Sequence, residues 1–102
     1  MNASSVSKFK YYVKSGDFVD VNSLSDSSVQ LYLSNDESGM CIIAIYNSSG
    51  KMLTTGLTVV EANAGDVTIT FSKFDDTQQY ILWVFFVNQY YVPMYESFTK
   101  GY

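Results

Sequence analysis

Carboxylates are the side chains best suited to acid–base chemistry in this 102-residue chain, because its ten Asp and Glu residues occur with no His. Asp75 and Asp76 are adjacent, and neighbouring residues of an extended chain point to opposite sides. Two such carboxylates cannot flank one glycosidic bond as a glycosidase pair does. The absence of His also excludes Ser-His-Asp and Cys-His nucleophiles. The sequence therefore predicts no catalytic residue and a protein that is not an enzyme.

Metal and redox chemistry have few candidate residues. Cys41 is the only cysteine, so the chain can form neither an internal disulfide nor a zinc site of the Cys or Cys/His type. It lies in "MCIIAIY", where a thiol packs as a small hydrophobe. The pairs Asp17 with Asp20 and Asp36 with Glu37 offer oxygen ligands for calcium, but no EF-hand spacing accompanies them. We expect no cofactor and no metal.

Charge and hydropathy exclude two kinds of partner. The six basic residues are all Lys, and the net charge is −4, so the chain repels polyanions and lacks the Arg fork that reads phosphates and guanine. Nucleic-acid binding is therefore not expected. The most apolar stretch, "YILWVFFVNQYY" (80–91), has seven consecutive apolar residues, against about 20 for a membrane-spanning helix. No membrane span is predicted.

Alternating polarity predicts β-strands. Residues 6–13, 28–34 and 66–72 alternate apolar and polar side chains, as strands with one buried face do. Clusters of Gly, Asn, Asp and Ser separate the apolar runs, and 47–50 is expected to be the tip of a hairpin. Six or seven strands at this spacing indicate a single all-β sandwich over 1–102, with a small closed barrel as the alternative. We expect a loop at 14–25, an edge strand at 89–98, and fraying at 1–5 and 99–102.

The second half of the chain resembles a known class of sandwich. "DDTQQYILWV" (75–84) resembles the approach to strand F of immunoglobulin and fibronectin type III domains, with Tyr80 at the corner Tyr and Asp76 before it. Residues 41–53 and 80–98 are similar to accessory modules at the ends of multidomain surface proteins and glycoside hydrolases from Firmicutes. Pro93 and Met94 fit the closing segment of those modules, whereas Val92 replaces their Lys. The resemblance implies an immunoglobulin-like or fibronectin III-like sandwich of about seven antiparallel strands. It further implies an extracellular or cell-surface, noncatalytic module.

The corner Tyr sets the phase of the strand at 80–87. In that class of sandwich the residue two after the Tyr points inward, so Leu82, Val84 and Phe86 should face the core. The alternate residues should then face outward, although none is polar. The expected neighbour, 40–46, is also apolar in both phases. The two strands would share an apolar outer face larger than soluble monomers usually expose, so something should cover it.

The sequence allows three alternatives for what covers this apolar outer face. The first is intramolecular: the loop at 14–25 or the C-terminal tail. The second is a protein surface, either a second copy or a neighbouring domain, because interface cores are rich in aromatic and poor in charged residues. The third is a glycan stacked on Trp83, Phe85, Tyr91 and Tyr95. The sequence therefore predicts a noncatalytic interaction or structural module. The expected partner-binding or ligand-binding residues are Ile81, Trp83, Phe85, Val87, Tyr91 and Tyr95.

Overall fold

The computed structural model describes residues 17–102, and these residues contain seven β-strands. The expected strand at 6–13 lies outside the described residues. No helix within 17–102 is long and apolar enough to cross a membrane. The strands are β1 (Val19–Leu24), β2 (Ser28–Leu33), β3 (Gly39–Asn47), β4 (Met52–Val60), β5 (Gly65–Thr70), β6 (Tyr80–Val87) and β7 (Phe98–Gly101).

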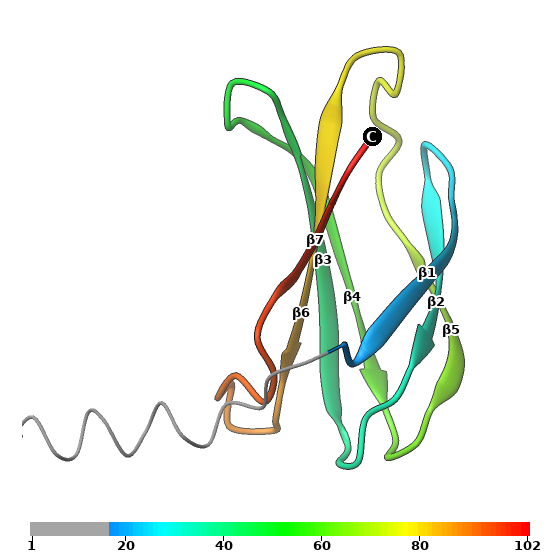
Figure 1. The fold of residues 1–102 in the computed structure, drawn as a ribbon, viewed down its shortest axis with the longest axis vertical. Helices are drawn as coiled ribbons and strands as arrows, with labels where there is room; N and C mark the ends of the chain where they lie inside the picture. The colour runs from blue at the N-terminus through cyan, green and yellow to red at the C-terminus, as the bar shows by residue number, and fades with distance from the viewer. Residues whose placement is uncertain (1–16) are drawn as a thin grey trace, which may run out of the picture.

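Two antiparallel sheets face each other (Figure 1). One has the order β1-β2-β5 and the other the order β4-β3-β6-β7. The β3–β4 hairpin is tipped by residues 47–50, as expected, and β6 pairs with β3 along its whole length. The predicted all-β sandwich of seven antiparallel strands is thus confirmed. The alternative of a closed barrel is wrong, because no described pairing joins the two sheets.

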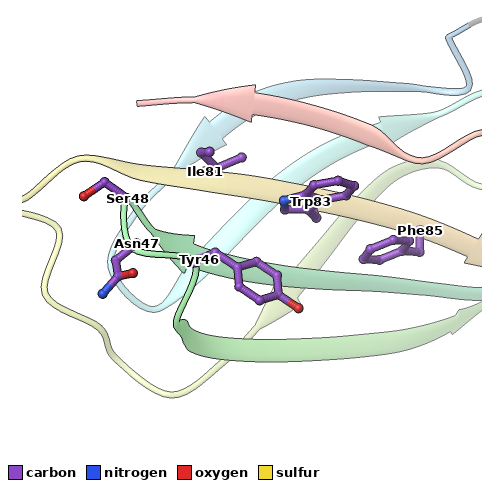
Figure 2. Close-up of a pocket in the computed structure, with 7 residues that line it drawn as sticks. Tyr46, Asn47, Ser48, Ile81, Trp83 and Phe85 are labelled. Atoms are coloured by element: carbon purple, nitrogen blue, oxygen red, sulfur yellow. The ribbon is translucent and has the colours of Figure 1, made fainter.

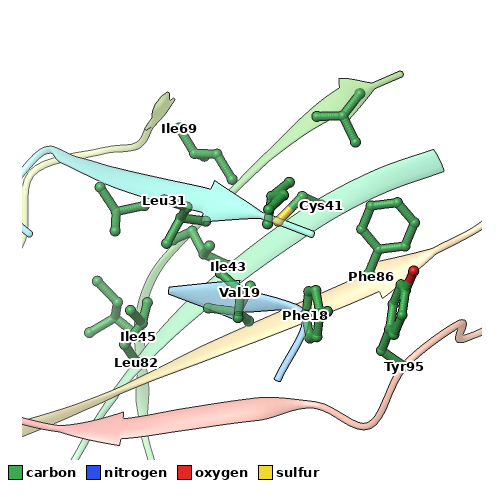
Figure 3. Packing of buried hydrophobic residues seen from close by; sticks show 14 of the residues in the cluster. Phe18, Val19, Leu31, Cys41, Ile43, Ile45, Ile69, Leu82, Phe86 and Tyr95 are labelled. Carbon is green, nitrogen blue, oxygen red and sulfur yellow. The ribbon is translucent and has the colours of Figure 1, made fainter. Parts of the chain in front are cut away.

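The core fills the space between the sheets, because β1, β2, β3, β5 and β6 each turn an apolar phase inward (Figure 3). In β6 this phase is Leu82, Val84 and Phe86, all at most 1% exposed, so the predicted phase is confirmed. Cys41 lies in the same core, also as predicted. The most completely buried apolar residues are Val29, Leu31, Leu33, Cys41, Ile43, Ile45, Ile69, Leu82, Val84 and Phe86.

The sheets are joined through a buried polar residue and a glycine. Asn35, in the β2–β3 crossover, donates through Nδ2 to the carbonyls of Glu37 (2.9 Å) and Glu61 (2.7 Å) and accepts from the Ala64 amide (3.0 Å). Gly56 of β4 faces β5 so closely that a Cβ there would lie 2.8 Å from the Thr70 carbonyl oxygen. These contacts fix how β4 and β5 approach each other across the sandwich.

Two expectations about irregular segments are wrong. Residues 19–24, expected within a loop, form β1, whose apolar Val19 and Val21 pair with Leu33 and Leu31. The edge strand expected at 89–98 instead lies at Phe98–Gly101, where fraying was expected. Asn88 turns the chain out of β6, since its Oδ1 accepts from the amides of Tyr90 (2.8 Å) and Val92 (3.1 Å).

Candidate functional site

The outward phase of β6 lies beside the outward phase of β3. The register places Ile81 opposite Tyr46, Trp83 opposite Ala44, Phe85 opposite Ile42 and Val87 opposite Met40. Ile81 is 40% exposed, and Trp83, Phe85 and Val87 are half-buried. The structure therefore brings together the four β6 residues expected at the binding face.

Strand β4 extends this face, which sequence reasoning did not anticipate. Leu57 pairs with Ile42 and Val59 with Met40, so their side chains share the outer side of the sheet. Leu57 is 58% and Val59 77% exposed. The sequence carried the signal as the alternation of Thr54, Gly56 and Thr58 with Thr55, Leu57 and Val59, but only the register with β3 shows which phase faces outward.

We call these outward side chains of β4, β3 and β6 the apolar outer face. None of its members carries a charge, and the nearest charged residues along the β3–β4 pair are Lys51 at the hairpin end and Glu37 and Glu61 at the other end. The members are Met40, Ile42, Ala44, Tyr46, Met52, Thr55, Leu57, Val59, Ile81, Trp83, Phe85 and Val87.

A shallow pocket of about 370 Å³ opens at the hairpin end of the apolar outer face (Figure 2). The Trp83 and Phe85 rings stack side by side, with centroids 5.8 Å apart and planes 12° from parallel. Across from them stands Tyr46 (Figure 2). Asn47 borders the pocket, but its Oδ1 already accepts from the amides of Ser49 (3.0 Å) and Lys51 (2.9 Å). The pocket therefore offers mainly apolar surface.

Tyr91 and Tyr95 do not join this face. Tyr95 is only 8% exposed: its ring stacks on Phe18 at 4.8 Å, and its hydroxyl donates to Asp36 Oδ1 at 2.6 Å. The expectation that Tyr95 is an exposed platform residue is wrong, because Phe18, the residue before β1, offers an inward stacking partner. Tyr91 is exposed, but it lies in the loop after β6 with a positive φ of 62°.

Neither described candidate for an internal cover lies over the apolar outer face. The chain at 19–24 belongs to the opposite sheet. Strand β7 pairs with β6 edge to edge, placing Phe98 beside Val84, and Met94 packs against the core. The exposure of Ile81, Leu57 and Val59 follows from this arrangement.

The titratable groups within the described residues are dispersed. Residues 17–102 hold no cluster of three His, Cys, Asp or Glu side chains suited to a metal ion. Asp75 is fully exposed, and hydrogen bonds from the Thr77 hydroxyl and amide lower its pKa. Burial raises the pKa of the Cys41 thiol to about 12, so the thiolate needed for nucleophilic attack does not form near neutral pH.

The fold is a fibronectin III-like β-sandwich, as two similar solved structures show. An FN3 domain of human collagen XX superposes with a TM-score of 0.52 at 16% sequence identity, covering 88% of this chain and 92% of that one. A β-glucuronidase of glycoside hydrolase family 2 superposes with a TM-score of 0.53 at 12% identity, over 82% of this chain and 10% of the enzyme. No family model and no curated protein sequence matches the chain. At these identities the likeness concerns the fold.

Proposed function

We propose that this chain is a noncatalytic interaction module of an extracellular or cell-surface multidomain protein, and that its apolar outer face binds a protein surface. The observation that carries the proposal is an uncharged face spanning three neighbouring strands, with Leu57, Val59 and Ile81 exposed on it. Large contiguous apolar patches on a protein surface often mark interaction sites. Absence of charge and abundance of aromatic rings are typical of interface cores.

The setting in a larger protein is part of the same proposal. The similar FN3 domain is one part of collagen XX, and the matching portion of the β-glucuronidase is one tenth of that enzyme. Both likenesses support a role as one domain among several. The likeness of 41–53 and 80–98 to accessory modules of Firmicutes surface and secreted proteins supports an extracellular location and a bacterial source.

The proposal requires that the face be open on the isolated domain, and a dye-binding experiment tests this. The dilute wild-type protein should enhance the fluorescence of the apolar dye 8-anilinonaphthalene-1-sulfonate, and Leu57→Ser and Trp83→Ser should each reduce the enhancement without abolishing cooperative unfolding. Thr68→Ser on the opposite sheet is the matched control and should leave the signal unchanged. A wild-type protein that binds no dye would show that the face is covered within the chain, contrary to the proposal.

A glycan is the second candidate, favoured by the nearly parallel, stacked rings of Trp83 and Phe85. Sugar faces stack on such rings, but specific sugar sites also place polar groups beside them. Here the Oδ1 of Asn47 is already used in closing the hairpin. Titration with a panel of oligosaccharides, followed by Trp fluorescence, separates the two candidates. Saturable quenching that Phe85→Ser removes would favour the glycan.

A further inference from the structure

The identity of the bound surface can be inferred from the apolar outer face itself, on the basis of the function proposed above. We propose that the occupant is a second copy of this chain, packed face to face with its strands antiparallel to those of the first. Three observations carry this: the distribution of charge at the two ends of the face, its dimensions, and the position of its pocket.

Opposite charges stand at opposite ends of the β3–β4 pair. Lys51 follows the hairpin tip, and Glu37 and Glu61 lie just beyond the pair Gly39 and Val60 at the other end. All three charged side chains are exposed. In an antiparallel arrangement, Lys51 of each copy meets the Glu37 and Glu61 end of the other, and the contact is made twice by symmetry. A parallel arrangement would instead bring like charges together, which disfavours it.

Other charges at the hairpin end do not reverse this pattern. Lys100 of β7 pairs with Leu82, whose side chain points inward, and its Nζ lies over the Tyr102 ring, so it places no charge on the outer face. Burial raises the pKa of the Tyr80 phenol, and the negative charge of Asp76 raises it further. Tyr80 shares the inward phase of Leu82 and packs edge-on against Phe74 at 4.9 Å. The residue that the Asp76 charge affects is therefore one of the inward phase.

The dimensions suit a weak dimer. Strands β3 and β4 have nine residues each, so at about 3.4 Å per residue they are about 30 Å long. Three strands about 4.8 Å apart are about 15 Å wide, which gives a flat footprint of about 450 Å² on each copy. Two copies together would bury about 900 Å², close to the about 1,000 Å² expected of a specific interface. The dimer should therefore depend on concentration.

The shape of the face agrees with the antiparallel arrangement. The pocket lined by Tyr46, Ile81 and Trp83 is at the hairpin end, whereas Val59, the most exposed apolar side chain of the face, is near the other end. Antiparallel packing brings the projecting end of one copy toward the hollow end of the second. Apolar anchors seated in pockets contribute most of the binding energy in many interfaces.

Sedimentation equilibrium from about 1 µM to about 1 mM, the range in which an interface of this size dissociates, tests the proposal. The wild-type protein should dimerise, and Trp83→Ser should weaken dimerisation at least about tenfold. Lys51→Glu and Glu61→Lys should each weaken it several-fold, and the double variant should restore it to within about twofold of the wild type.

Lys73→Glu is the matched control, because it changes the net charge as Lys51→Glu does. In the wild type the Lys73 Nζ lies 3.5 Å from Asp26, which is outside the apolar outer face. Lys73→Glu should leave the dimer unchanged.

Each contrary outcome has a distinct meaning. A dimer that Trp83→Ser weakens but that the double variant does not restore would overturn the antiparallel arrangement. A monomer at every concentration would overturn the second copy as occupant, while dye binding by the wild type would leave the proposed function standing for a neighbouring domain or other protein. A dimer that neither Trp83→Ser nor Leu57→Ser affects would place self-association elsewhere. Leu57→Ser keeps the test valid if the Trp83 variant fails to fold. Leu57 is more than half exposed, so its replacement should not disturb folding.

Discussion

The two sheets of this sandwich share one core but differ in their outer faces. On the β1-β2-β5 sheet the outer positions include Asp20, Gln30, Asp66 and Thr68, which are exposed and polar. On the β4-β3-β6-β7 sheet the corresponding positions are almost entirely apolar. A sheet that packs on a core needs only one apolar face, so folding alone explains the first sheet. The second apolar face of the other sheet requires a different explanation, and the binding proposed above would supply one.

The largest effect should come from the core that both sheets share. Leu82→Ala removes a completely buried side chain between the sheets and should lower the free energy of unfolding by about 2–5 kcal/mol. Trp83→Ser, one residue along the same strand, should leave cooperative unfolding largely intact, because Trp83 faces outward. Urea unfolding of both variants measures the difference. A loss at Trp83→Ser as large as that at Leu82→Ala would mean that the outer face is itself a core.

A smaller effect is expected where the chain crosses between the sheets. Asn35→Ala leaves the Glu61 carbonyl and the Ala64 amide without their buried partner and should cost about 1–3 kcal/mol. Asn22→Ala, at an exposed position of β1, is the control and should change stability by less than about 0.5 kcal/mol. Thermal unfolding compares the two. Equal stability of both variants would show that the Asn35 hydrogen bonds contribute little.

Cys41, on the inward side of β3, should make the stability of the protein depend on pH in the alkaline range. Burial raises the pKa of Cys41 from 9.0 to about 12, so the native state holds this proton more tightly than the unfolded chain does. The stabilisation is complete below about pH 9 and is lost between about pH 9 and pH 12, at about 1.4 kcal/mol per pH unit. Wild-type and Cys41→Ala proteins, unfolded in urea across this window, should differ by that slope. Parallel curves would contradict the raised pKa.

The smallest effect on stability, but a direct test of the contrast, comes from exchanging polarity between the outer faces. Leu57→Thr and Thr68→Leu alter exposed positions on opposite sheets and should each change stability by less than about 0.5 kcal/mol. Leu57→Thr should nevertheless weaken dye binding and self-association, whereas Thr68→Leu should not weaken either. If both variants behave alike in sedimentation, the two outer faces do not differ in function.

Much of this arrangement is local and could be predicted from the sequence. Alternation with a period of two predicted strands at 28–34 and 66–72, and these ranges match β2 and β5 to within two residues at each end. The phase of β6 followed from the position of Tyr80, which begins the strand as expected. The predicted edge strand at 89–98 was wrong. Its aromatic residues favour a strand, but the hydrogen bonds of Asn88 impose a turn that the pattern of polar and apolar residues does not reveal.

The sequence by itself determined that the chain is all-β, that 80–87 has two apolar faces, and that Cys41 is a core residue. These features depend on the order of residues along one strand. The tertiary structure decided that Leu57 and Val59 join Trp83 on one face, that Tyr95 turns inward to Asp36, and that no described segment covers the face. Which strands become neighbours, and in which register, depends on packing between segments far apart in the sequence, so a pattern within one strand cannot specify it.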